Sequence, residues 1–170
     1  MKPWSEQAPA LRFFVRGVAR SQGSKIGLGR LRKDGRPYAV MVEAGGGALK
    51  AWRADVKQAA SVELGDALPT PRDVGLRVEM TFFMPRPQSQ TRAERLRRFV
   101  TKSPDLDKLE RAVLDALTAV VWVDDSQVAE VDKRKVYADD MPPGVNVTVA
   151  VLEGLKEVVL ERIGDGGSSS

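Results

Sequence analysis

The sequence contains no cysteine and no histidine among its 170 residues. Without cysteine, the chain has no disulfide, no thiolate nucleophile and no thiolate-ligated zinc. Without histidine, it has no Ser-His-Asp triad, no imidazole acid–base catalysis and no imidazole metal ligand. Any catalysis must therefore use carboxylates, Lys, Arg, Ser or Tyr, or a hard cation bound by oxygen atoms.

The sequence also lacks an apolar run of membrane-spanning length and, near its start, the apolar core of a secretory signal. We therefore expect a cytoplasmic protein without membrane contacts, and no small-molecule organic cofactor. The length is typical of one domain with a sizeable core. We expect a flexible segment over residues 1–10, the domain over 11–153, and a terminal helix with a disordered Gly/Ser tail over 154–170.

Charge is unevenly distributed along the chain. Residues 1–102 contain 20 Lys and Arg against 9 Asp and Glu, whereas residues 103–170 contain 7 against 14. Much of the positive charge lies in two segments, 12–36 and 86–102. Either segment alone is more simply explained as a solvated loop. Basic segments beside an acidic region are nevertheless the pattern of a protein that holds a polyanion and acts on it at the acids.

The apolar pattern predicts five strands and two main helices. We expect strands over residues 11–18, 38–42, 74–84, 127–137 and 144–152, helices over 49–64 and 104–117, and a Gly- and Arg-rich loop over 19–35. The Pro-Pro-Gly turn at 142–144 predicts that the last two strands pair antiparallel. This order predicts an α+β domain of two layers, with two main helices against a mixed sheet of about four to five strands.

The rest of the chain is organised around the helix predicted at 104–117. Apolar residues at 106, 109, 113, 117 and 120 follow the period of one buried helical face. Ser103 is expected to be the N-cap, with Pro104 at the first helical position. Midway along the helix, Asp115 is expected to pair with Arg111.

Two acidic pairs flank this helix. Asp105 and Asp107 lie at its start, and Asp124 and Asp125 follow its end. Each pair alone has an ordinary explanation, since acidic residues are favoured at helix starts and in turns. Together, with basic flanks and no histidine, they indicate four carboxylates that converge on a cation. Mg²⁺ prefers such ligands, and two ions about 4 Å apart activate a water and stabilise the leaving oxygen of a phosphodiester.

Three segments carry a specific resemblance: Lys102–Leu109 (KSPDLDKL), Ala112–Leu117 (AVLDAL) and Trp122–Val128 (WVDDSQV). Together they resemble the RusA family of Holliday junction resolvases. Three earlier segments, Phe13–Val15, Gln22–Lys25 and Met84–Pro87, are also similar to phage-type members. The resemblance implies a homodimer that cuts four-way DNA symmetrically with Mg²⁺, for which Mn²⁺ is expected to substitute.

The resemblance also implies roles for single residues. By position, the family's metal-binding acids are matched by Asp105, Asp107 and Asp125, with Asp124 beside them. The family usually has Asn where Lys108 stands and often a catalytic Lys where Arg111 stands. Because Arg is not deprotonated in proteins, the implied role of Arg111 is to stabilise charge at the scissile phosphate rather than to act as a base.

The basic segments are expected to bind the DNA backbone. The candidate residues are Arg20, Lys25, Arg30, Arg32, Lys33, Arg92, Arg95, Arg97, Arg98 and Lys108. Two other interpretations remain open: a non-catalytic DNA-binding module with a capped and paired acidic helix, and a metal-dependent nuclease that acts on flaps or RNA.

Overall fold

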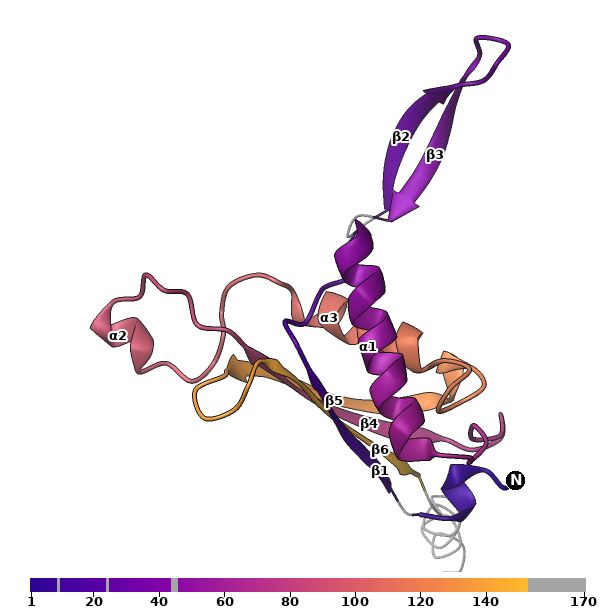
Figure 1. Ribbon diagram of the computed structural model, residues 1–170, viewed down its shortest axis with the longest axis vertical. Coiled ribbons are helices and arrows are strands. Elements are labelled where there is room, and N and C mark those ends of the chain that lie inside the picture. The colour runs from indigo at the N-terminus through magenta and orange to yellow at the C-terminus, as the bar shows by residue number, and fades with distance from the viewer. Residues whose placement is uncertain (9, 24, 44–45, 153–170) are drawn as a thin grey trace, which may run out of the picture.

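A four-stranded mixed sheet with helices packed on one face forms the body of the molecule (Figure 1). The structure is a computed structural model that describes residues 1–8, 10–23, 25–43 and 46–152. The strand order is β1 (Ala10–Arg16), β6 (Gly144–Val151), β4 (Leu76–Met84) and β5 (Val128–Tyr137). The two main helices are α1 (Gly46–Leu64) and α3 (Leu106–Leu117). The predicted α+β class is confirmed.

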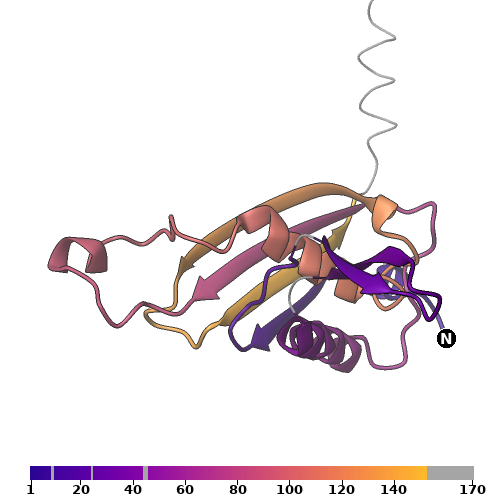
Figure 2. The same ribbon diagram turned by 90° about the horizontal axis from the view of Figure 1, so that it is seen from above.

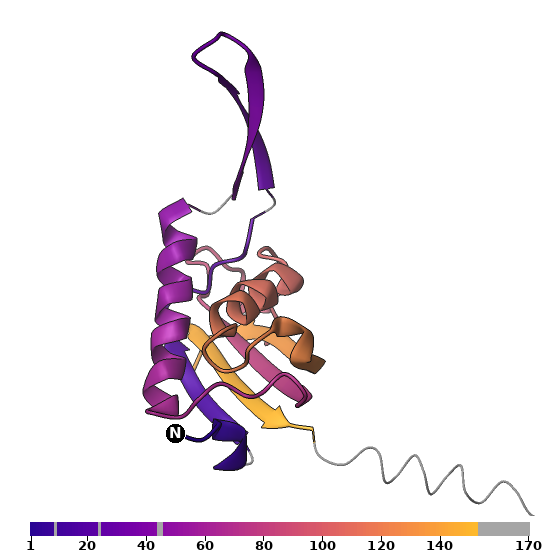
Figure 3. The same cartoon turned by 90° about the vertical axis from the view of Figure 1, so that its right-hand side faces the viewer.

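Alternation along the strands explains why the helices cover one face only. In β4, Leu76, Val78 and Met80 are buried, whereas the side chains between them, Arg77 and Glu79, are exposed. The helices cover the buried face, as Figure 3 shows. They contribute Leu49, Trp52, Val56 and Ala60 from α1, and Leu109, Ala112, Val113, Ala116 and Leu117 from α3. Each large apolar side chain fully buried here is worth about 1.5–3 kcal/mol relative to an exposed one.

The last two strands do not form the predicted antiparallel pair. β5 pairs in parallel with β4, and β6 pairs antiparallel with both β4 and β1. The reason is that α3 connects β4 to β5 as a crossover, which places the two strands side by side in the same direction. The following chain then passes the end of β4, where the Ala138 N–H donates to Met84 O at 2.9 Å. At Gly144 β6 runs so close to β1 that a Cβ atom would lie 2.3 Å from Val15 O.

A β-hairpin replaces the loop predicted over residues 19–35. β2 (Lys25–Leu31) pairs antiparallel with β3 (Pro37–Glu43) in a separate two-stranded sheet, which projects beyond the start of α1 (Figure 1). Gly27 and Gly29 interrupt the alternation of apolar and polar residues that signals a strand, so the sequence does not predict β2. The strand predicted over residues 38–42 corresponds to β3. The hairpin turns at Gly35, whose φ of 79° is readily adopted by glycine.

The start of the chain is anchored, unlike the flexible segment predicted for residues 1–10. Trp4, in the short 3-10 helix η1 (Trp4–Glu6), is 3% exposed, and its Nε1 donates to Val121 O at 2.8 Å. A lone Trp before a proline-bounded strand gives no periodic signal, so its burial was missed. The terminal helix and tail predicted over 154–170 lie outside the described residues. Within the described ranges, no helix is long and apolar enough to cross a membrane.

Candidate active site

The start of α3 is set by Asp105 rather than by Ser103. Asp105 is the N-cap, with extended backbone (φ −67°, ψ 140°), and its carbonyl accepts the Leu109 N–H at 3.1 Å. Pro104 therefore precedes the helix instead of opening it. The cause lies in β5, because Lys135 Nζ donates to both Lys102 O and Pro104 O at 2.7 Å and so fixes this segment outside the helical pattern.

Asp105 and Asp107, at the start of α3, make few contacts that would stabilise the fold. The Asp105 carboxylate makes no capping hydrogen bond and instead lies 3.1 Å from Lys108 Nζ, with 61% of its side chain exposed. Asp107 is exposed in the first turn, and its carboxylate has no hydrogen bond or ion pair within the described part of the chain. Both carboxylates are exposed, and only that of Asp105 has a partner, Lys108, so this helix start is open to a cation.

Arg111 follows Asp107 by four residues, so both lie on the same exposed side of α3. It too has no partner within the residues that the structure describes. The predicted pair with Asp115 is absent, because Asp115 lies 2.8 Å from Arg53 Nη2 of α1. That ion pair ties the two helices together and leaves the Arg111 guanidinium free for a ligand.

The second acidic pair has a different character. Asp124 caps the 3-10 helix η2 (Asp125–Gln127), accepts the Ser126 N–H at 3.0 Å and lies 3.1 Å from Arg72. The hydrogen bond from Ser126, and then the charge of Arg72, lower the pKa of Asp124. Asp125 beside it is exposed and has no partner within the described residues. Asp124 therefore holds a turn, and only Asp125 is uncommitted.

The two acidic pairs do not converge within one chain. α3 runs antiparallel along β5, since Glu110 pairs with Lys133 and Pro104 O accepts from Lys135. η2 immediately precedes β5, so it lies at the far end of α3. Twelve helical residues span roughly 18 Å, several times the reach of one ion. Accordingly, no three acidic side chains in the described ranges are placed to hold a metal. The predicted convergence is wrong for a single chain.

The predicted DNA contacts surround the start of α3. Arg20 is exposed on the loop after β1, and this loop reaches α3 where the Gln22 N–H donates to Lys108 O at 2.9 Å. The hairpin begins three residues later. Arg32 and Lys33 are exposed at its turn, while the side chains of Lys25 and Arg30 lie outside the described residues. The hairpin therefore leaves the body beside the acids.

A second basic projection, the arm of residues 86–102, extends from the body in a different direction from the hairpin (Figures 1 and 2). It contains the short helix α2 (Arg92–Arg95), and Arg92, Arg95, Arg97 and Arg98 are all exposed. A capping box between Thr91 and Glu94 starts α2, and hydrogen bonds from Thr91 lower the pKa of Glu94. The arm joins the start of α3 directly, so basic segments flank the acids on both sides.

Arg86 organises this arm, a role that its place in the sequence does not predict. Its guanidinium pairs with both carboxylate oxygens of Asp139, donates to Arg97 O at 3.0 Å, and lies 4.2 Å from the ring centroid of Tyr137. The hydrogen bond between them raises the pKa of Arg86 and lowers that of Asp139. Its sequence signals are its position between two prolines and its place in the family-like segment Met84–Pro87.

Gln127 fixes the turn at the far end of α3, as Arg86 fixes the arm. It is 6% exposed, and its Oε1 accepts the N–H groups of Val123 and Asp124 at 3.0 Å. Its Nε2 donates to Pro71 O at 2.6 Å. A buried amide with both ends satisfied fixes the turn that carries Asp125.

Comparison with known proteins gives one family. The family model described as endodeoxyribonuclease RusA matches residues 30–150. This range includes the arm, α3 and both acidic pairs, and begins within β2. No curated protein matches the chain.

Proposed function

Because the chain belongs to the RusA family of endodeoxyribonucleases, we propose that it resolves Holliday junctions by Mg²⁺-dependent hydrolysis of one phosphodiester in each of two strands. Mn²⁺ is expected to substitute. The observation that carries this proposal is the exposed start of α3, where Asp107 and Arg111 have no partners in the described structure and basic segments flank them. An acid that binds a cation and an arginine that binds phosphate are both available there.

The residues fit Mg²⁺ if the nucleic acid completes the site. Mg²⁺ is usually bound through one or two carboxylates, with waters and substrate phosphates as its other ligands. Asp105 and Asp107 supply two carboxylates, and both are exposed. When bound, the metal would activate the attacking water and stabilise charge on the leaving oxygen.

The other groups have roles set by their charge. Lys108 neutralises Asp105 in the free protein, and its ammonium becomes available to a phosphate when Asp105 binds a cation. Arg111 contacts the scissile phosphate and stabilises the charge that develops on it. The candidate backbone contacts on the hairpin and the arm hold the arms of the junction, because phosphate contacts position nucleic acid without reading its sequence.

We further propose that a homodimer completes the acidic site. Asp125 is uncommitted but lies at the far end of α3, too distant to share an ion with Asp107 of its own chain. In a two-fold dimer, the same surface is presented by both copies, so Asp125 of one protomer can approach Asp107 of the other. Two such sites would cut the two strands symmetrically.

Mixing two inactive variants tests this arrangement. Asp107→Asn and Asp125→Asn should each abolish cutting alone. If each site takes one acid from each protomer, half of the dimers after mixing are heterodimers and each has one intact site. Strand nicking should therefore return to about a quarter of the wild-type value. If both acids acted within one protomer, the mixture would stay inactive.

The reaction itself is tested with labelled four-way junctions. We expect paired symmetric nicks with Mg²⁺ and none with EDTA. Unlabelled flap DNA and structured RNA, offered in excess, should compete poorly with the junction. Preferential cutting of flaps or RNA would replace the proposed substrate while retaining the metal site.

A further inference from the structure

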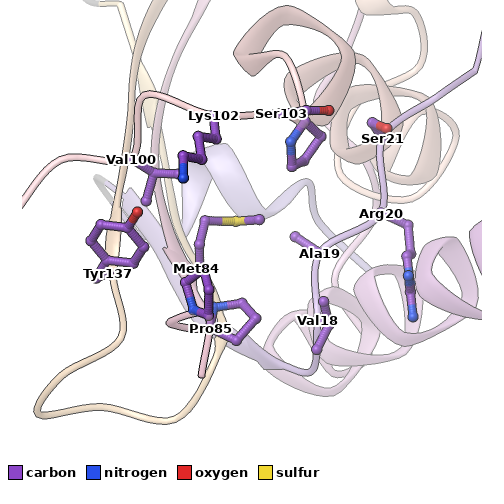
Figure 4. A pocket seen from close by; sticks show the side chains of 12 residues that line it. Val18, Ala19, Arg20, Ser21, Met84, Pro85, Val100, Lys102, Ser103 and Tyr137 are labelled. Atoms are coloured by element: carbon purple, nitrogen blue, oxygen red, sulfur yellow. The ribbon is translucent and has the colours of Figure 1, made fainter. Parts of the chain in front are cut away.

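A small cavity opens beside the start of α3 (Figure 4). Its volume is about 340 Å³, at the small end of the range of about 300–1,000 Å³ found for ligand pockets. The floor is apolar, and Met84 reaches across it toward Ala19, with Tyr137 on one side and Arg20 on the other. The cavity therefore suits one compact and largely apolar group.

The rim of the cavity is cationic. Arg20 and Lys102 line it, and none of the described lining residues is acidic. Lys102 is 73% exposed and lies 3.6 Å from Glu94, which is a loose and solvent-screened pair. A group that enters with a phosphate attached thus meets positive charge at the entrance.

Tyr137 forms a wall between this cavity and a neighbouring one. Both cavities are lined by Tyr137, but Arg86 lines only the neighbour, where its guanidinium lies 4.2 Å from the ring centroid. The Tyr137 N–H is also fixed, because it donates to Arg98 O at 3.0 Å. Arg86 lies over the Tyr137 ring, and the same ring lines the small cavity. An aromatic side chain held in place in this way is a group on which nucleobases stack.

We propose that the small cavity binds one unstacked nucleobase of the junction, which stacks on Tyr137 while its phosphates contact Arg20 and Lys102. This inference rests on the proposed function and adds a base-binding site to it. A base at a branch point is the least costly to unstack, because its pairing and stacking are already interrupted. Pro104 lines the cavity and directly precedes Asp105, so the bound base lies beside the cut. Because stacking itself accepts every base, any preference near the scissile phosphate comes from the limited volume of the cavity.

The test fills the cavity from its rim. Val18 lines it and is 43% exposed, so Val18→Trp places an indole at the entrance without enlarging the core. Val62→Trp is the matched control, because Val62 lies on α1, is 70% exposed and does not line the cavity. Tyr137→Leu tests the stacking ring, since it removes the aromatic ring and keeps an apolar side chain.

The probe is a set of junctions in which one nucleotide near the crossover is replaced by an abasic site, position by position. For the wild type, binding in Ca²⁺ should weaken by about fivefold or more at one position, because a stacked base is lost. Val62→Trp should show the same sensitive position, whereas Tyr137→Leu should lose most of the difference at that position. Val18→Trp should bind more weakly to every intact junction and show no further loss at that position.

Cutting of randomised junctions with Mg²⁺ provides the second measurement. The wild type should prefer one base at the sensitive position, and Val18→Trp should lose that preference. Failure of the wild type to cut any junction would overturn the proposed function. The binding scan would still show whether the cavity binds a nucleobase. An unchanged scan and an unchanged base profile in Val18→Trp, or no sensitive position in the wild type, would overturn the nucleobase site alone.

Discussion

Aspartates lie near both ends of α3, but those at its start are exposed with few contacts, whereas Asp124 near its far end is held by hydrogen bonds. At the start, Asp107 is exposed without a partner in the described structure, and Asp105 touches only Lys108. At the far end, Asp124 is bound by a backbone N–H and by Arg72, in a turn that Gln127 fixes. An acid that already satisfies hydrogen bonds stabilises its turn, while an acid left unsatisfied is available to a ligand. Burial and partners, rather than residue type, therefore separate candidate ligands from structural acids.

The surroundings of the two ends differ in the same way. The basic hairpin, the arm of residues 86–102 and the small cavity all lie next to the start of α3. The far end is instead tied to the body through Arg72, Pro71 and the buried Trp4. The first end is exposed and flanked by basic segments, whereas the second holds Asp125 in a turn fixed by Gln127.

If the acids at the start of α3 bind the metal, Asp107→Asn should reduce cutting activity more than any other single change. It keeps the shape of the side chain and removes a charge from the proposed metal site, so cutting in Mg²⁺ should fall by orders of magnitude. Junction binding without metal should persist or tighten, because a carboxylate facing phosphate has become neutral. The control, Asp55→Asn on the exposed side of α1, should cut normally. If Asp107 were only a helix-start charge, activity would be retained and stability would fall by on the order of 0.3–1 kcal/mol.

Arg111→Ala should have the next largest effect. Loss of one group that stabilises charge in the transition state costs about 10²–10³ in kcat. Arg111→Lys should recover part of this loss, because the charge remains although the bidentate geometry does not. Single-turnover cutting at saturating enzyme separates this loss from weaker binding. Arg16→Ala, on the exposed face of the sheet, controls for the loss of one positive charge. A similar loss in both variants would remove Arg111 from the site.

Alanine at Arg30, Arg32 and Lys33 should weaken binding without touching the chemistry. Each lost phosphate contact should reduce the slope of log K against log salt by about 0.9 in magnitude. The rate at saturating DNA should remain close to that of the wild type, since the acids are unchanged. Alanine at Lys50 and Lys57 on α1 is the control. An unchanged slope in the hairpin variant would show that the hairpin does not contact DNA.

Asp124→Ala should have the smallest effect, and on stability rather than on chemistry. Loss of a capping side chain should lower Tm by about 2–4 °C for a chain of this size. Asp124→Asn retains the cap and should lose less. Because the pKa of Asp124 is lowered on folding, its stabilisation is present above its unfolded value of about 3.8 and is lost as pH falls below it. The Tm difference between wild type and Asp124→Ala should therefore narrow below about pH 4.

Much of the fold could be predicted because its signals are local. Alternation identified β4 and β6, and the apolar spacing of α3 located the helix that carries Asp105 and Asp107. The family motifs lie on the same helix and on the turn after it, so the family followed from residues close together in sequence. The family model over 30–150 confirms that identification.

What could not be predicted depends on contacts between distant residues. The parallel neighbour of β5 is chosen by the crossover of α3, not by the turn at 142–144. The helix is capped by Asp105 rather than by the predicted Ser103, because Lys135, thirty residues after Asp105, donates to the carbonyls of Lys102 and Pro104. Whether Asp124 binds a metal or caps a turn depends on Arg72 and Ser126, and only the folded chain brings Arg72 there.

The strand order determines when the sheet can form during synthesis of the chain. β6, the last strand, lies inside the sheet between β1 and β4, so Ala10 pairs with Ala150 from nearly the other end of the described chain. During synthesis, β1 has no partner strand until β6 leaves the ribosome. Such distant pairing slows folding, because the loop must close before its contacts form. The nuclease sheet, and with it the base of the acidic helix, is therefore completed only after the residues of β6 have been synthesised.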